Sequence, residues 1–288
     1  MTSVQKLLLH LDSSTHPSVF DRVVAFDGGA EQVMSYGGVT DAAVRDLVHG
    51  AIFTRGPKDL RNTAIFIGGT EMAAGERLLR AATKAFFGPL RVSVMLDSNG
   101  SNTTAVAAVK KLQQAVGDVR GRRAVITAGT GPVGLRAAGL LAKAGADVVI
   151  TSRRAADADL LRSLNERFGG AVRSVTLADS SQAAGVLEGA ALVLNTGPAG
   201  VTLIPRTAWA GRSGLRAVAD LNAVPPAGIE GIEATDDGAE REGVRTFGAL
   251  GVGKLKMKLH KACIARLFEQ NDLVLDLETI SELADELK

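Results

Sequence analysis

Short apolar runs alternate with amphipathic segments of helix length along almost the whole chain. In the first part, the runs that predict strands are 6–11, 32–36 (the weakest), 63–68 and 91–96. The segments between them that predict helices are 17–26, 40–49 and 70–86. This alternation of strand and helix is typical of parallel α/β layers.

The segment SNTTAVAAVKKLQQAVG (101–117) predicts one more helix. Ser101 or Asn102 can cap its first amides, and Gly117 can end it. Its apolar residues fall on one stripe: Ala105, Val109, Leu112 and Val116.

The glycine- and arginine-rich run GDVRGRR (117–123) is the best candidate for a domain boundary. After it the βα rhythm restarts, with expected strands at 123–128, 147–152, 173–178, 191–196 and 216–221. We therefore expect an α/β protein of two domains, 1–119 and 120–271, the second being a Rossmann domain with a parallel sheet. The last segment, 272–288, predicts an acidic amphipathic helix that belongs to either domain.

Composition narrows the classes of function. The chain has 288 residues and a net charge of +2, and no basic run exceeds three residues, so nucleic acid is not an expected partner. One cysteine, Cys263, excludes an internal disulfide and fits a reducing compartment. The four histidines show no metal-ligand spacing. The segment MTSVQKLLLHLD is too short for a signal sequence or a membrane span, so a cytoplasmic protein is expected.

A GxGxxG turn lies between a predicted strand and a predicted helix. In dinucleotide-binding domains the first glycine permits the tight turn, the second admits the pyrophosphate and the third allows close helix–strand packing. The following helix N-terminus adds partial positive charge. The expected cofactor contacts in this turn are Gly129, Thr130, Gly131, Pro132, Val133 and Gly134.

The end of the next strand predicts which nucleotide binds. NAD-selective domains place Asp or Glu here to hold the ribose hydroxyls. This chain has Ser152, Arg153 and Arg154 instead, and an arginine fork binds a 2′-phosphate bidentately. We therefore predict NADP as the cofactor. Two solvated arginines at a strand end are the alternative.

Two later strand ends carry polar turns on the same edge of the expected sheet. Asn195, Thr196 and Gly197 follow one strand, and Asn222 and Ala223 follow another. These turns suit close passage of a nicotinamide ribose, although each by itself is an ordinary loop.

Acid–base machinery is scarce in the chain. The run MLDSNGSNTT (95–104) is rich in small polar groups, but only Asp97 in it ionises near neutral pH. The lone Tyr36 is followed four residues later by Thr40, not by lysine. Oxidising an alcohol needs a proton acceptor, whereas a methylene group held between two amine nitrogens can lose a hydride without one. The sequence therefore favours a substrate that needs orientation more than proton transfer.

Six blocks spread along the chain are long enough to be specific for a family. They are PSVFDRVVAFDGGA (17–30), GGTEMAAGERLL (68–79), FFGPLRVSVMLDSNGSNTTA (86–105), AGTGPVG (128–134), DLNAVPPAGI (220–229) and FGALGVGKLKMKLHKACIARLFE (247–269). Together they resemble the NADP-dependent methylene-tetrahydromethanopterin dehydrogenases of methylotrophic bacteria. The resemblance implies oxidation of a methylene-pterin, tetrahydromethanopterin and also its tetrahydrofolate analogue, with NADP as acceptor. It further implies an N-terminal pterin domain, an interdomain cleft and a homo-oligomer, with a trimer expected.

With this resemblance, the polar run acquires a candidate role. Asp97, Ser98, Asn99 and Asn102 are expected to line the cleft and to match the amide and amine edges of a pterin. Simple helix capping by Ser101 or Asn102 is the alternative. Asp21 either faces the same cleft or is a solvated helix residue.

The block GKLKMKLHK places one lysine at the edge of an apolar helix face, where a charged side chain is unusual. If 254–267 is helical, Lys256 falls beside Cys263 at the edge of the apolar face. We expect Lys256 to reach the pterin or nicotinamide and to act through orientation and charge. Snorkelling along the helix is the alternative.

Three other functions compete with this one. A bifunctional folate dehydrogenase/cyclohydrolase usually needs Tyr and Lys at i, i+4, which Tyr36 lacks. A reductase of small carbonyls is weakened by the missing proton donor. A non-catalytic NADP-binding module leaves the polar run in the first domain unexplained.

Overall fold

The structure is a computed structural model that describes residues 4–287, and the chain divides into two compact units. The first unit runs to Thr103 and resumes at Met257, and the second covers Thr104–Lys256. Each unit contains its own sheet flanked by helices, so the α/β prediction is confirmed. Residues 1–3 of the N-terminal segment considered as a possible signal lie outside the described residues.

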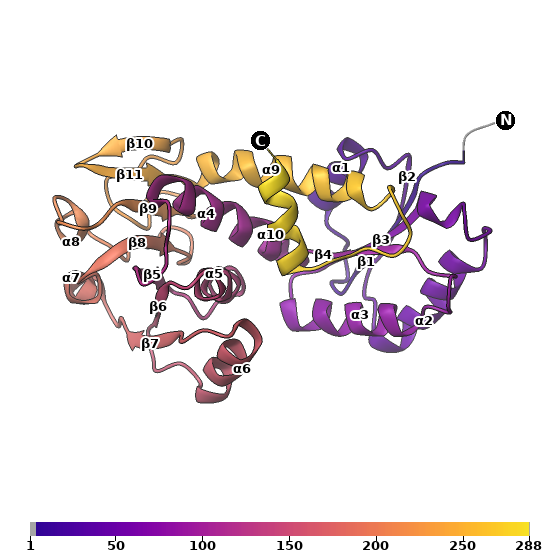
Figure 1. The fold of residues 1–288 in the computed structure, drawn as a ribbon, viewed down its shortest axis with the longest axis horizontal. Helices are drawn as coiled ribbons and strands as arrows, with labels where there is room; N and C mark the ends of the chain where they lie inside the picture. The colour runs from indigo at the N-terminus through magenta and orange to yellow at the C-terminus, as the bar shows by residue number, and fades with distance from the viewer. Residues whose placement is uncertain (1–3, 288) are drawn as a thin grey trace. The chain divides into compact units, whose positions relative to one another are not determined.

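The first unit is built on a five-stranded sheet in the order β12-β4-β3-β1-β2 (Figure 1). All of its strand pairs are parallel. The strands are β1 (Leu7–Asp12), β2 (Gln32–Tyr36), β3 (Thr63–Gly68), β4 (Ser93–Leu96) and β12 (Val274–Leu275).

Helices cover both faces of this sheet (Figure 1). The helices that belong wholly to the first unit are α1 (Val19–Asp27), α2 (Asp41–Ile52), α3 (Met72–Lys84) and α10 (Leu277–Glu286), with η1 (Leu60–Asn62) and η2 (Ser98–Gly100) as short 3₁₀ turns. Helices α2 and α3 pack in one core cluster with Leu9, Leu11 and Ile65. On the other face, a side chain at Gly28 would collide with Ile264, so α1 closely approaches the end of the helix α9 (Ala249–Arg266).

The second unit is a doubly wound domain. Its sheet has seven strands in the order β10-β11-β9-β8-β5-β6-β7, and only the β10–β11 pair is antiparallel. The strands are β5 (Arg123–Thr127), β6 (Asp147–Ser152), β7 (Arg173–Thr176), β8 (Ala190–Asn195), β9 (Ala217–Asp220), β10 (Asp237–Arg241) and β11 (Val244–Phe247). The helices are α5 (Pro132–Lys143), α6 (Ala158–Phe168), α7 (Ala183–Val186) and α8 (Arg206–Trp209), with the 3₁₀ turn η3 (Ser180–Gln182). Winding reverses between β5 and β8, as in Rossmann domains.

The division between the units falls inside two helices, α4 (Ser101–Val116) and α9 (Ala249–Arg266). The expected division at 119/120 and 271/272 therefore differs from the observed one. Residues 117–122 form a turn between α4 and β5, in which Gly117 and Gly121 adopt positive φ. A glycine-rich turn is visible in a sequence, whereas a division within a continuous helix has no compositional signal.

The C-terminal segment is only partly helical, which corrects the prediction for 272–288. Val274 pairs with Val94, so β12 becomes an edge strand of the first sheet. The helix begins only at Leu277, after Asp276 and Thr279 form a capping box. Two residues of strand are too few to show a periodicity of their own, so this segment looked like the start of the helix.

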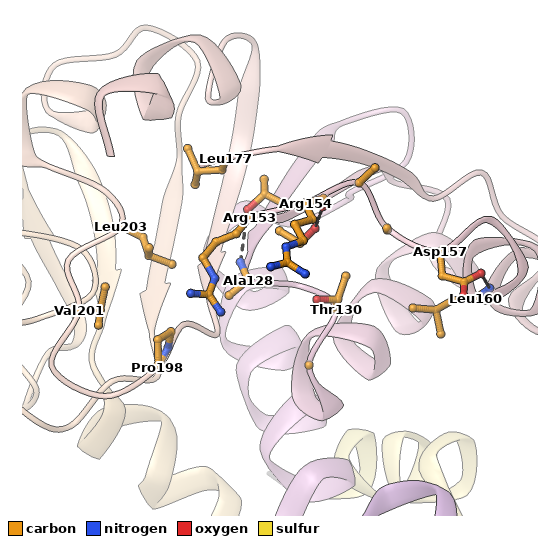
Figure 2. Close-up of a pocket in the computed structure, with 15 residues that line it drawn as sticks. Ala128, Thr130, Arg153, Arg154, Asp157, Leu160, Leu177, Pro198, Val201 and Leu203 are labelled. Carbon is orange, nitrogen blue, oxygen red and sulfur yellow. Dashed lines mark hydrogen bonds between the residues drawn. The ribbon is translucent and has the colours of Figure 1, made fainter. Parts of the chain in front are cut away.

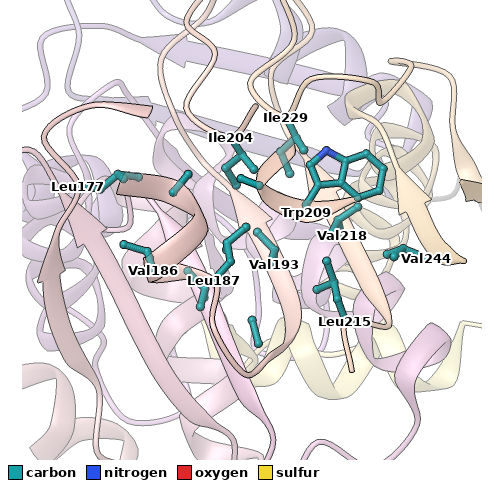
Figure 3. Close-up of a cluster of buried hydrophobic side chains, with 14 of the residues drawn as sticks. Leu177, Val186, Leu187, Val193, Ile204, Trp209, Leu215, Val218, Ile229 and Val244 are labelled. Carbon is teal, nitrogen blue, oxygen red and sulfur yellow. The ribbon is translucent and has the colours of Figure 1, made fainter. Parts of the chain in front are cut away.

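The core of the second unit surrounds the only tryptophan (Figure 3). Trp209 is fully buried among Ile204, Val218 and Ile229, and its Nε1 donates to the Glu230 carbonyl over 2.9 Å. No helix within residues 4–287 combines the length and the apolar character that crossing a bilayer requires.

We expect Ile204→Ala to destabilise this unit by about 2–5 kcal/mol, because it removes fully buried methyl groups and leaves a cavity. Urea unfolding followed by Trp209 fluorescence reports on this unit directly. Val224→Ala, at an exposed position, is the matched control and should change stability by no more than about 0.5 kcal/mol. Equal effects of both substitutions would contradict the assigned core.

Candidate functional site

The glycine turn between β5 and α5 is shaped by backbone packing. A Cβ on Gly129 would lie 2.7 Å from Ile150 Cβ, and one on Gly134 would lie 2.6 Å from Gly129 Cα. Both positions therefore require glycine within the fold itself. At Gly131 the nearest atom would be 3.7 Å away, so no internal contact demands glycine there. The space beside Gly131 is left for an approaching group at the N-terminus of α5.

A cavity of about 1160 Å³ opens at this turn (Figure 2). Of the residues expected to hold the cofactor, those that line it are Thr130, Gly131, Ser152, Arg153 and Arg154. Leu160, Leu177 and Leu203, which sequence reasoning missed, supply apolar walls. These leucines come from three separate segments, so no local pattern in the sequence brings them together.

The charges in the cavity favour an anion. Arg153 and Arg154 are exposed and form no ion pair within residues 4–287. Asp157 also lines the cavity, but its carboxylate accepts hydrogen bonds from the Asp159 and Leu160 amides and caps α6. The arginines are therefore the groups free to bind a phosphate.

The asparagine that ends β8 forms hydrogen bonds within the fold. Asn195 is fully buried; its Oδ1 accepts from Thr127 Oγ1 at 2.6 Å, and its Nδ2 donates to Asp220 Oδ1 at 2.7 Å. Asp220 also accepts from the backbone amides of Asn222 and Ile229. This network ties together the ends of three neighbouring strands, β5, β8 and β9.

The remaining residues expected near the nicotinamide lie around this network. Thr196 donates to the Thr127 carbonyl, and Asn222 donates to the Pro226 carbonyl and accepts from the Val224 amide. None of the five residues expected there lines the cavity: Asn195, Thr196, Gly197, Asn222 and Ala223. The same is true of Gly129, Pro132, Val133 and Gly134 in the glycine turn. Among these residues, the side chains of Asn195, Thr196 and Asn222 form hydrogen bonds that hold the turns in shape.

In the first unit, the Asp97 carboxylate lies at the N-terminus of α4. It is fully buried; Oδ1 accepts from the amides of Asn102 and Thr103, and Oδ2 accepts from Thr103 Oγ1 at 2.6 Å. Asp97 therefore caps α4, five and six residues before the amides it binds, whereas the alternative named Ser101 or Asn102 as the cap.

Other members of the polar run are also engaged. Ser98 Oγ donates to the Gly68 carbonyl at 2.8 Å, and Asn102 Nδ2 donates to the Leu96 carbonyl at 2.6 Å. Both side chains are buried. Asn99 alone among the four predicted residues is exposed, and it adopts a left-handed conformation with φ of 57°. These hydrogen bonds fix the connection between β4 and α4.

Asp21 and Lys256 are both buried charged residues, each 9% exposed. Asp21 lies in the first turn of α1. Because its side chain is buried, the alternative of a solvated helix residue is wrong. Lys256 lies on the buried stripe of α9 between Val252 and Leu259, more central than its predicted position at the edge of the apolar face. Burying a charged side chain is costly, so both positions are unusual for these residue types.

Sequence reasoning missed two buried histidines beside this segment. His260 stacks on Phe66 with centroids 5.5 Å apart, and its Nδ1 lies 3.9 Å from Asp97 Oδ2. The ring centroid of His10 lies 5.3 Å from that of Phe66, and burial lowers the pKa of His10. Burial raises the pKa of the Cys263 thiol far above its usual range, aided by Asp97. Cys263 is therefore a structural thiol.

Comparisons with known proteins place the chain among dehydrogenases. The family described as "Methylene-tetrahydromethanopterin dehydrogenase, N-terminal" matches residues 19–99, and the family described as "FAD binding domain" matches residues 122–231. Two relatives come from Methylorubrum extorquens strain AM1. "Bifunctional protein MdtA" is 51% identical over 98% of this chain and 99% of that protein. "NAD(P)-dependent methylenetetrahydromethanopterin dehydrogenase" is 34% identical over 97% of this chain and 98% of that protein.

Solved structures resemble the chain in fold alone. Shikimate 5-dehydrogenase from Listeria monocytogenes, solved with shikimate and NAD, has a TM-score of 0.54 at 15% identity and covers 98% of this chain and 97% of that chain. Ornithine carbamoyltransferase from Pyrococcus furiosus has a TM-score of 0.55 at 13% identity, with 91% and 84% covered.

Alanine substitutions of Gly131 and Gly134 should have opposite effects on stability and on dinucleotide binding. Gly131→Ala fits the fold, so stability should stay within about 0.5 kcal/mol of the parent, whereas dinucleotide affinity should fall because the methyl group occupies the approach path. Gly134→Ala forces Cβ against Gly129 and should destabilise the second unit. Thermal unfolding and calorimetric titration of the nucleotide separate the two effects. Unchanged affinity in Gly131→Ala would remove this turn from the binding site.

Proposed function

The chain belongs to the methylenetetrahydromethanopterin dehydrogenase family, and we propose that it oxidises methylene-tetrahydromethanopterin to the methenyl form by direct hydride transfer to NADP⁺. The resemblance drawn from the sequence is thus confirmed at the level of the family. We extend the proposal to methylene-tetrahydrofolate as a second substrate, in one-carbon metabolism. The observation that carries the proposal is the second-unit cavity, which combines a dinucleotide turn with Arg153 and Arg154.

The residues of this cavity fit NADP. The open space at Gly131 and the amides that begin α5 receive the pyrophosphate, and the paired arginines receive the 2′-phosphate. The leucine walls accept the adenine. A match to an FAD-binding family over 122–231 reflects the same turn and the same βα order, which both dinucleotides use. Full-length similarity to an NAD(P)-dependent relative favours the nicotinamide.

In this proposal, catalysis depends on how the protein positions the pterin relative to the nicotinamide. When bound, NADP⁺ supplies the hydride acceptor, and the charge left on the substrate is shared between the two flanking nitrogens. The residues of the chain then have to orient both ligands and exclude water. No proton transfer is required of them, in keeping with the Asp97 carboxylate, which is buried and hydrogen-bonded within the fold.

The substrate and cofactor assignment is tested by four assays of the pure protein, pairing each methylene-pterin with NADP and with NAD. We expect turnover of both pterins with NADP, and a lower dissociation constant for NADP than for NAD. Turnover of neither pterin would defeat the proposal and would favour a non-catalytic NADP-binding module. Hydrolysis of the methenyl product would instead favour the cyclohydrolase type, for which Tyr36, exposed on β2 and followed by Thr40, lacks the lysine.

Arg153→Met and Arg154→Met should each raise KM for NADP by roughly 10- to 100-fold, since a charge-assisted hydrogen bond contributes about 1.5–3 kcal/mol. KM for NAD should not change, because NAD has no 2′-phosphate. The matched control is Arg162→Met, an exposed arginine of α6 outside the cavity, which should behave like the parent. A parallel rise in both KM values would show that the arginines do not read the phosphate.

Lys256 is proposed to contact the pterin or the nicotinamide through its charge. Lys256→Ala and Lys256→Met should lower kcat/KM for the pterin at least tenfold while the NADP dissociation constant and unfolding temperature of the methionine variant stay near the parent values. Lys258→Ala, exposed on the same helix, is the control. Unchanged catalytic efficiency in both Lys256 variants would remove the residue from the site.

A further inference from the structure

The first unit has a cavity of its own, which none of the predicted site residues lines. Its volume is about 750 Å³. Three segments form it: 13–15 after β1, 39–42 at the start of α2, and 70–78 at the start of α3. All three lie within one compact unit, so the cavity is a property of that unit.

The cavity lies where a ligand is expected in this topology. The sheet order β2-β1-β3-β4-β12 sends the chain from β1 to one side and then to the other, so winding reverses between β1 and β3. In open α/β sheets of this order, ligands bind outside the carboxyl ends of the strands at this reversal. The same rule locates the nucleotide cavity in the second unit, where Gly131 follows β5 and Pro198 follows β8.

Glycines hold the strand exits close around the cavity. Gly69 has a φ of +100°, and a Cβ there would lie 2.1 Å from Ser13 Oγ. A Cβ on Gly37 would lie 2.3 Å from the Thr15 carbonyl oxygen. Ser14 Oγ accepts the Thr70 amide at 3.1 Å, which joins the exits of β1 and β3. The hydroxyl groups of the three segments are therefore gathered at one place.

The cavity offers hydrogen-bond donors and acceptors side by side. Arg77 Nε lies 3.3 Å from Asp41 Oδ2, and both side chains are about half exposed, at 51% and 54%. Such an exposed pair is held weakly, so a ligand can use both partners. Within the described chain, the N-cap side chains Thr40 and Glu71 bind no amide of α2 or α3, and these first turns keep donors available.

This mixture matches a chain of neighbouring hydroxyl groups. Each hydroxyl both donates and accepts, so it needs donors and acceptors together. A phosphate or carboxylate would meet the negative charges of Asp41 and Glu71, which line the cavity with one arginine. An aromatic ring alone would leave the polar lining unpaired. The lining therefore favours a polyol over an anion or an apolar group.

We propose that the cavity between β1 and β3 binds a polyhydroxylated arm of the substrate and selects tetrahydromethanopterin over tetrahydrofolate. This inference rests on the proposed function. The arm of tetrahydromethanopterin includes a ribitol chain, whereas the arm of tetrahydrofolate ends in glutamate carboxylates. The cavity accepts the hydroxyl groups of the ribitol chain, for which the arm of tetrahydrofolate has no counterpart.

The test uses Arg77→Met and Asp41→Asn in the full-length protein. Each should raise KM for methylene-tetrahydromethanopterin tenfold or more, with kcat and KM for NADP within twofold of the parent. KM for methylene-tetrahydrofolate should change less than twofold. The matched controls are Arg80→Met and Asp46→Asn, exposed on the same two helices and outside the cavity, and they should behave like the parent.

Equal shifts in KM for the two pterins, or no shift for either, would overturn the inference while the proposed function stands. If neither pterin is oxidised, the proposed function fails, and calorimetric titration with tetrahydromethanopterin still decides the inference. Binding by the parent that weakens tenfold in Arg77→Met but not in Arg80→Met would support the cavity. Equal binding in all three proteins, or none in the parent, would overturn it.

Discussion

A buried carboxylate at the end of a parallel strand, bonded to the backbone amides that follow it, is the interaction on which both units depend. Asp12 ends β1 and accepts the amides of Ser14 and Ser18. Asp97 follows β4, and Asp220 ends β9, and each accepts two backbone amides of the segment after it. Parallel strands bury both faces of a sheet, so the turn at each carboxyl end must satisfy its own polar groups. The aspartates do so, and the turn that Asp12 fixes lines the cavity of the first unit.

This use of carboxylates explains why polar strand ends coexist with so little acid–base chemistry. The oxygens of Asp97 and Asp220 are occupied by internal donors, and both residues are buried. They position the backbone, and the ligand contacts that we propose come from residues lining open space, such as Arg153 in the second unit and Arg77 in the first. A reaction that requires only alignment of two carbon atoms suits such a framework.

The sequence predicted the repeating βα order and the nucleotide turn because both depend on local signals, periodicity and glycine spacing. It failed where a role depends on distant partners. The hydrogen bonds that Asp97 accepts within the fold, for example, were not visible in the sequence. The hydroxyls of 13–15 were overlooked, although they follow a strand just as the run 98–102 does. The depth of Lys256 and the pairing of Val274 with Val94 likewise depend on neighbours far along the chain.

The proposed mechanism requires the protein to align two ligands and to transfer no proton. Single-turnover oxidation of methylene-tetrahydromethanopterin deuterated at the methylene carbon tests it directly, with the rate followed from about pH 6 to pH 9. All of the transferred deuterium should appear in NADPH, and the rate of transfer should not vary with pH. Loss of deuterium to solvent, or a rate that follows the titration of one side chain, would contradict it.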